Sequence, residues 1–160
     1  MNLAFGTDER TPVTDAVVAL LRAQGHSLLL VGPQAGEQDA WPAVARGVAE
    51  QVACGAVAEG ILFCWTGTGV SIAANKVPGI RAALCGDAET ARGARLWNDA
   101  NVLCLSLRLT TAAVAEEILS AWFSHVYQPN DTDNACLAQV AALEARYRAQ
   151  SPIDEKAPQA

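Results

Sequence analysis

The segment that decides the fold runs from Gly60 to Gly69 and reads GILFCWTGTG. Its first half is apolar and ends at Cys64, and two glycines follow within the next five residues. A short apolar run that leads into glycines is typical of a buried strand, because glycine tolerates the tight backbone needed to turn from a strand into a helix. The segment therefore predicts a strand over 60–64, a turn, and a helix from Val70 to Lys76.

Similar strand and helix patterns alternate along the rest of the chain. Apolar runs predict four more strands, at 2–6, 27–31, 80–84 and 101–105. Helical periodicity predicts helices over 13–24, 40–54, 87–97 and 111–123, and a last amphipathic helix through about residue 147. Strands that alternate with helices form a parallel sheet covered on both faces. We therefore expect an α/β fold, a three-layer Rossmann-like sandwich with a five-stranded parallel sheet.

Length and composition limit the classes of protein to consider. The chain has 160 residues, of which 51% are hydrophobic and 18% charged, and its net charge is -6. This length suits one domain, predicted over residues 1–150 with a flexible tail over 151–160. The negative charge argues against a nucleic-acid partner, and no apolar run is long enough to span a membrane. Five cysteines without a CxxC pair and only two histidines disfavour structural zinc and indicate free thiols in the cytoplasm.

Ligands of such sheets bind beyond the carboxyl ends of the strands. The residues expected there are Asp8 and Glu9, the Cys64–Gly69 segment, Cys85 with Asp87, and Ser106–Arg108. In the Cys64–Gly69 segment, glycines let backbone amides turn toward a ligand at the start of a helix, which favours an oxyanion. Cys64 is then a candidate base or nucleophile, and the alternative is a buried inert thiol. The spacing fits neither a Walker loop nor a dinucleotide fingerprint.

Three stretches of the chain resemble a known family of sugar isomerases. They are Gly60–Lys76, Gly79–Leu84 and Asn98–Val102, which read GILFCWTGTGVSIAANK, GIRAAL and NDANV. They are similar to the ribose-5-phosphate isomerase B and galactose-6-phosphate isomerase family, and the resemblance covers about residues 1–127. It implies aldose–ketose isomerisation through a cis-enediol, without a metal or cofactor, in a site at a dimer interface.

The resemblance also implies roles for individual residues. Cys64 matches the catalytic base that moves the proton between C1 and C2. The residues that match the anion hole for the enediolate are Thr66 and the amides of Gly67, Thr68 and Gly69. The residues that match sugar and phosphate contacts are Asp8 for the hydroxyls, Asn98 for the substrate and Arg108 for the phosphate.

The chain departs from the family at several of these positions. Glu9 stands where the family has a histidine, Trp97 replaces the histidine proposed to open the sugar ring, and Trp65 replaces a glycine. The two arginines that grip phosphate fall on Asp131 and Ala135 when the C-terminal segments are aligned without gaps. These changes predict a weakened phosphate site, with Arg10 as a partial replacement and with Glu9, Trp65 and Trp97 as substrate contacts.

Three functions remain open at this point. The first is a homodimeric or homotetrameric isomerase of a small sugar or sugar phosphate of the pentose-phosphate type. Short open-chain sugars suit it because they need no ring opening. The second is one subunit of a hetero-oligomeric isomerase that needs a homologous partner chain. The third is a non-catalytic sugar-binding relative.

Overall fold

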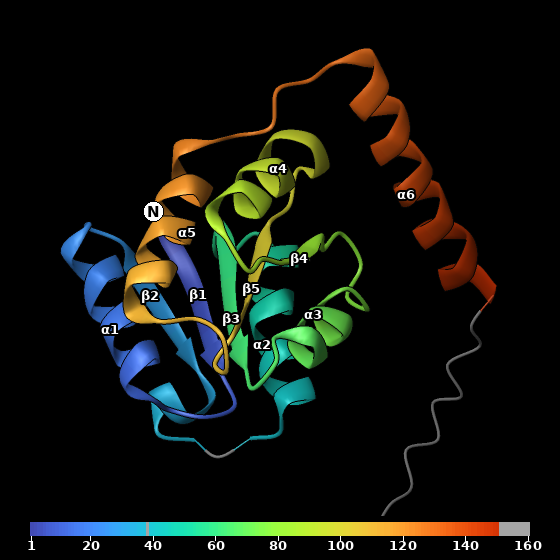
Figure 1. Ribbon diagram of the computed structural model, residues 1–160. Coiled ribbons are helices and arrows are strands. Elements are labelled where there is room, and N and C mark those ends of the chain that lie inside the picture. The colour runs from blue at the N-terminus through green and yellow to red at the C-terminus, as the bar shows by residue number, and fades with distance from the viewer. Residues whose placement is uncertain (38, 151–160) are drawn as a thin grey trace, which may run out of the picture. The chain divides into compact units, whose positions relative to one another are not determined.

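The centre of the protein is a parallel five-stranded sheet with the strand order β2-β1-β3-β5-β4 (Figure 1). In the computed structural model, which describes residues 1–37 and 39–150, the strands are β1 (Asn2–Thr7), β2 (Ser27–Val31), β3 (Glu59–Cys64), β4 (Ala82–Leu84) and β5 (Val102–Ser106). All four neighbouring pairs are parallel. β3 is the middle strand and every one of its residues is buried. The predicted parallel sheet is confirmed.

Helices cover both faces of this sheet and complete the predicted three layers. The helices are α1 (Pro12–Ala23), η1 (a 3-10 helix, Gly32–Ala35), α2 (Trp41–Ala53), α3 (Thr68–Ala74), α4 (Ala88–Asn98) and α5 (Ala112–Ser124). One apolar cluster joins the sheet to α1, α4 and α5, and a second joins the other face to α2 and α3 (Figure 1). Each helix therefore buries one apolar stripe against the strands.

Short polar residues begin three of the helices where the sequence pattern changes from strand to helix. Thr11 caps α1 by accepting a hydrogen bond from the Thr14 amide, as predicted, with Pro12 in the first turn. Asp87 and Thr111 cap α4 and α5 in the same way. These caps satisfy amides that have no acceptor inside the helix.

The chain divides into two compact units, Met1–Gln128 and Pro129–Ala160, and each is described by itself. The first unit is the α/β sandwich, which ends at Gln128. The sequence pattern predicts a single domain that ends at residue 150. The second contains α6 (Asp131–Gln150). This last helix begins directly after Asn130, whose side chain accepts a hydrogen bond from the Asp133 amide at 2.9 Å. The tail predicted over 151–160 lies outside the described residues.

The strand order also identifies a crevice suited to a ligand. From β1 the chain moves to β2 on one side of the sheet, and β3 then lies on the other side of β1. Connections that leave in opposite directions open a crevice at the carboxyl ends of the two strands. The crevice lies between the ends of β1 and β3, where Asp8 and the loop after Cys64 begin.

Candidate active site

Most of the predicted site residues meet at the carboxyl ends of β1 and β3. Thr7 pairs with Phe63 in the sheet, so that the next residues, Asp8 and Cys64, leave neighbouring strands side by side. A cavity of ≈ 280 Å³ opens at this point. The residues that line it are Asp8, Trp41, Cys64, Trp65, Thr66, Thr68 and Gly69.

Cys64 is held at the base of this cavity by its own backbone. It is the last residue of β3, and only 5% of its surface is exposed. Its carbonyl oxygen accepts hydrogen bonds from the Gly67 amide at 3.1 Å and the Leu107 amide at 3.0 Å. The strand end is thereby fixed from both sides, and Cys64 lines the cavity while it stays almost fully buried.

The loop after Cys64 has a backbone that requires glycine. Gly67 has a φ of 75°, and a Cβ atom there would lie 3.0 Å from the carbonyl oxygen of Leu105. Gly67 is the N-cap of α3, so the amides of the first helical turn, Thr68 and Gly69 among them, have no acceptor within the helix. The hydroxyls of Thr66 and Thr68 lie 2.6 Å apart. This arrangement of donors suits an oxyanion that develops beside Cys64.

Trp41 is a wall of the cavity that the sequence analysis did not identify. It is the first residue of α2, and its indole lies over the backbone of Gly69. The signal in the sequence was an aromatic residue before Pro42, at the start of a helix that follows a strand end. Helix starts and strand ends meet at the same edge of an α/β sheet, so an aromatic side chain there is a candidate ligand contact.

Asp8 presents an unused acceptor to the same cavity. Among the described residues, its Oδ1 atom is buried and has no hydrogen-bond partner. Burial raises the pKa of the Asp8 carboxyl, the nearby charge of Glu9 raises it further, and a hydrogen bond from the Asp8 amide opposes both effects. A half-buried carboxyl with a free oxygen is suited to accept a hydrogen bond from a sugar hydroxyl.

A second cavity, of ≈ 560 Å³, is also lined by Asp8. Its lining residues are Asp8, Glu9, Arg10, Pro33, Asp39 and Ala40. Arg10 is the cation in this set, and its Nε donates to Asp15 at 2.8 Å. The charge of the predicted phosphate contact is therefore already matched by a carboxylate.

Arg108 lies close to the Cys64 loop but does not line its cavity. It follows β5, and its amide donates to the carbonyl oxygen of Trp65 at 2.9 Å. The side chain is exposed. Arg108 is thus a cation beside the site that has no carboxylate partner among the ion pairs of the described residues.

Trp97 and Asn98 lie at the opposite edge of the sheet from Cys64. They end α4, which runs back to the start of β5, whereas Cys64 ends β3. The six residues of β3 separate the two edges by roughly 15 Å at the usual rise per residue. The Trp97 ring packs against Gly93 and the Arg92 guanidinium of its own helix. One chain therefore does not bring these two predicted residues to Cys64.

The other four cysteines fit the alternative interpretation, in which the thiol has no catalytic role. Cys54 and Cys136 are exposed, and Cys85 and Cys104 are buried. Burial raises the pKa of the Cys85 thiol to about 12, with a further contribution from Asp87, and burial also raises the pKa of Cys104. No cluster of three or more His, Cys, Asp or Glu side chains in the described ranges is arranged to hold a metal. Over the same residues, no helix has the length and hydropathy to cross a membrane.

Comparisons with known proteins identify similar sequences and structures. A family model described as Ribose/Galactose Isomerase matches residues 3–140. Ribose-5-phosphate isomerase B of Escherichia coli strain K12 is 39% identical over 127 residues, which is 79% of this chain and 85% of that protein. Galactose-6-phosphate isomerase subunit LacB of Clostridium acetobutylicum is 34% identical over 144 residues, which is 89% of this chain and 83% of that one.

A solved structure of Clostridium thermocellum ribose-5-phosphate isomerase B superposes with a TM-score of 0.86 at 33% identity, covering 92% of this chain and 99% of that chain. The matched regions contain the sheet, the Cys64 loop and the end of α4.

Proposed function

Because the chain belongs to the ribose/galactose isomerase family, it is an aldose–ketose isomerase, and we propose that Cys64 is the base that moves the proton. The observation that carries this proposal is the shared cavity. Cys64, Asp8 and the glycine loop all line it, so a thiol, a carboxyl and several amide and hydroxyl donors face one small volume. The substrate that fits these groups is a small sugar phosphate.

The proposed reaction moves one proton between two carbons. The Cys64 thiolate removes the proton from C2 of the open-chain aldose, and the electron pair of that bond forms the C1–C2 double bond of a cis-enediol. The former carbonyl oxygen at C1 takes up a proton. The thiol then returns its proton to C1, the hydroxyl at C2 loses its proton, and the ketose results. Nothing is oxidised or reduced overall, so the step needs no cofactor.

The loop after Cys64 provides what the intermediate needs. Negative charge grows on the sugar oxygens only during the reaction, so donors aimed at that charge accelerate it more than they aid binding. Thr66 and the amides of Thr68 and Gly69 are such donors, and the sharp backbone at Gly67 supports this arrangement. The Gly67 amide, expected to be a further donor, instead donates to the carbonyl oxygen of Cys64 at 3.1 Å.

The charges around the cavity limit the substrate. Asp8 accepts from a sugar hydroxyl, and Arg108 contacts the phosphate. The remaining neighbours are acidic, with Glu9 and Asp39 lining the adjoining cavity and Arg10 paired with Asp15. One phosphate held by few cations fits this surface better than a second anionic group would.

We further propose a homodimer whose sites use both copies. Asn98 and Trp97 are exposed at the edge of the sheet away from Cys64 of the same chain. A second copy supplies them to the first copy's Cys64 cavity, and symmetry makes the exchange mutual. In such a dimer Trp65 and Trp97 face the substrate from two different chains.

The helix α6 supports this association. Cys136, Val140, Leu143 and Tyr147 are all exposed, and their spacing of four, three and four residues places them along one stripe. An exposed apolar stripe of this kind is suited to a second copy of the chain.

A hetero-oligomeric subunit is the second candidate function. The similarity to the LacB subunit favours it, because that relative is named as one subunit of its enzyme. In this case the Asn98 segment comes from a homologous partner chain and not from an identical one. Purified chain alone then has no activity.

We place the enzyme in the cytoplasm. The support is that all five cysteines are free thiols. A reducing compartment preserves the Cys64 thiol that the reaction needs.

One experiment tests the proposed function directly. The purified chain is assayed in D2O with phosphorylated aldoses of four to six carbons, and its mass in solution is measured in parallel. Exchange of the abstracted proton with the solvent during the enediol stage predicts ketose product that carries deuterium at C1. Full turnover of a Cys64→Ala variant would exclude Cys64 as the base, and turnover by the homo-oligomer would exclude the obligate partner chain.

A further inference from the structure

The turn directly after Asn98 has an unusual backbone. Asp99 has φ 46° and ψ 43°, and it is the sole non-glycine residue with a positive φ in the part of the chain that the structure describes. Asp enters this left-handed conformation more readily than most residues with a Cβ atom, and such a residue commonly ends a helix. The conformation ends α4 and sets the direction in which the exposed Asn98 leaves the helix.

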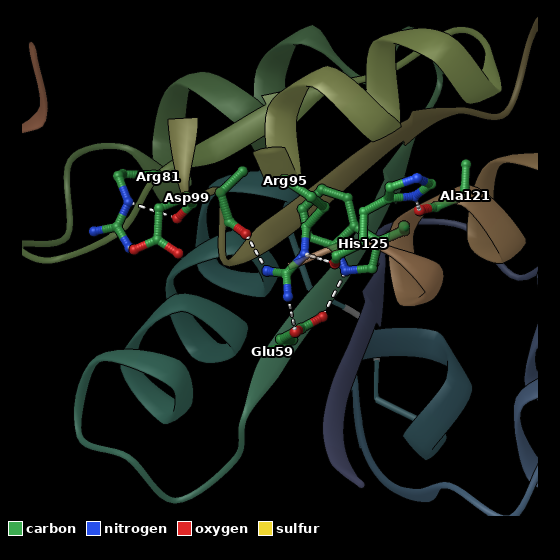
Figure 2. A network of polar contacts seen from close by, with 8 residues as sticks. Glu59, Arg81, Arg95, Asp99, Ala121 and His125 are labelled. Atoms are coloured by element: carbon green, nitrogen blue, oxygen red, sulfur yellow. Dashed lines mark hydrogen bonds and ion pairs between the residues drawn. The ribbon is translucent and has the colours of Figure 1, made fainter. Parts of the chain in front are cut away.

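Arg81 holds Asp99 with two hydrogen bonds (Figure 2). Its Nη2 donates to the Asp99 carboxylate at 2.7 Å, and its Nε donates to the Asp99 carbonyl oxygen at 2.6 Å. One guanidinium thus fixes both the side chain and the backbone of Asp99. The Arg81 amide in turn donates to the side chain of Asn101 at 2.8 Å, so the clamp is tied to the start of β5.

A second arginine holds the same turn from the side of the core. Arg95 donates to the carbonyl oxygen of Ala100 at 2.5 Å and to the buried carboxylate of Glu59 at 2.7 Å (Figure 2). Only 9% of Arg95 is exposed. The segment from Trp97 to Asn101 is therefore fixed between two guanidinium groups, although its Trp97 and Asn98 side chains have no role in the core.

We propose that Arg81 is a positioning residue that acts through Asp99 to orient Asn98 for the Cys64 site of the other copy. The inference rests on the proposed function, in which Asn98 completes the partner's site. Two arginines that fix one exposed turn are more than an idle surface loop needs, and such support is expected where a side chain must be presented accurately. Arg81 therefore serves catalysis at a site from which its own side chain is distant.

The first test compares Arg81→Ala with Arg46→Ala. Arg46 belongs to an exposed ion pair on α2 with a 3.9 Å separation, so its removal controls for loss of a surface charge. Arg81→Ala is expected to lower kcat/KM by about 10- to 100-fold, with the same division between kcat and KM as Asn98→Ala. Arg46→Ala is expected to match the parent enzyme.

The decisive test uses a mixed dimer. Arg81→Ala and Cys64→Ala chains are co-expressed with different tags, and the heterodimer is isolated by passing through both affinity columns. One of its sites combines the intact Cys64 with an intact Arg81–Asp99 clamp from the other chain. Activity is therefore expected to return to about half of the wild-type value, one good site in two. If Arg81 acts within its own chain, the heterodimer stays as impaired as the Arg81→Ala homodimer, and the proposal is wrong.

Two further variants keep the outcomes separable. Asp99→Asn tolerates the left-handed backbone but loses the ion pair, so it is expected to show a milder form of the Arg81→Ala defect and also tests the clamp if Arg81→Ala does not fold. Full activity of both clamp variants beside an inactive Asn98→Ala would overturn the inference alone. Full activity of Asn98→Ala would instead overturn the proposed shared site.

Discussion

Gly69 and Trp41 lie in contact across the entrance to the Cys64 cavity, and a Cβ atom on Gly69 would come within 3.1 Å of Cε3 and 3.2 Å of Cδ2 of the indole. Gly69 is not in the left-handed region, so its lack of a side chain serves this contact and not the turn. The absence of a side chain at Gly69 therefore leaves room for the Trp41 indole, which forms one wall of the cavity.

The contact between Gly69 and Trp41 predicts that substitutions at the two positions have non-additive effects on kcat/KM. Gly69→Ala pushes the indole by a few tenths of an ångström and is expected to raise KM and lower kcat/KM. Trp41→Ala removes the wall and is expected to broaden the accepted chain length. In the double variant the added methyl group meets no ring, so the effect of Gly69→Ala should disappear in a double-mutant cycle of kcat/KM. Additive effects would show that the two residues act separately.

Replacing the proposed base should remove activity without unfolding the protein. Cys64→Ser keeps the size of the side chain but replaces the thiol with a far weaker acid, and turnover is expected to fall by at least about 100-fold. The exposed Cys54, changed to serine, is the matched control and should leave turnover unchanged. An active Cys64→Ser enzyme would remove the base assignment.

The buried pair of Glu59 and Arg95 predicts a large effect on stability. Their side chains are 9% and 11% exposed, and Glu59 also accepts a hydrogen bond from the Trp122 indole at 2.5 Å. Arg95→Met leaves a buried carboxylate without its charge partner, which is expected to cost about 3–5 kcal/mol of unfolding free energy. Glu59→Gln combined with Arg95→Met removes the buried charge and should recover part of that loss in urea unfolding. A single variant as stable as the parent would contradict this.

Asp8 predicts a dependence of stability on pH with a defined sign. Its pKa is raised by burial above the ordinary value of 3.8, so folding favours the protonated carboxyl. This contribution is complete below about pH 4 and is lost as the pH rises through the folded-state pKa. Asp8→Asn should therefore melt at a higher temperature than the parent at pH 7, and the two should converge near pH 3.

Asp15 is the control with the opposite sign. Its pKa is lowered by hydrogen bonds from Arg10 and Gln34, so the ionised form stabilises the fold above the unfolded-state pKa and its contribution is lost as the pH falls. Asp15→Asn should melt at a lower temperature than the parent at pH 7. The melting temperatures are followed by circular dichroism between pH 3 and 8, and shifts of the same sign for Asp8→Asn and Asp15→Asn would contradict one of the two assignments.

The apolar stripe on α6 predicts control of association. Leu143→Glu places a charge in the stripe and is expected to shift the protein toward the monomer and to reduce activity in proportion. Ala142→Glu carries the same charge on a different side of the helix and should remain dimeric. Light scattering distinguishes them, and a dimeric Leu143→Glu protein would show that α6 does not mediate association.

Most of the fold followed from local patterns in the sequence. Apolar runs marked each strand, with a glycine near the end of all but β5, and caps such as Thr11 marked helix starts, because these signals depend on residues close together in the chain. Glu59 was not predicted to belong to a strand, because a carboxylate at the start of an apolar run is typical of a loop. It is buried because Arg95 and Trp122, far away in sequence, satisfy it.

The candidate site was harder to predict as a whole. Asp8 and the loop from Cys64 to Gly69 were found because strand ends meet at one edge. Trp41 was missed because its role depends on contact with Gly69, which no spacing reveals. The distance of Asn98 from Cys64 depends on the direction of α4, which the sequence does not reveal. A sequence motif also does not say which copy of the chain provides each residue of a shared site.

The opposite locations of Cys64 and Asn98 also bear on when the enzyme becomes competent. Under the proposed arrangement a newly folded monomer has no isomerase activity, and association is the last step of its maturation. Specific activity should then decline on dilution below the dissociation constant of the dimer. The cell could set the onset of turnover through protein abundance alone, with no dedicated regulator.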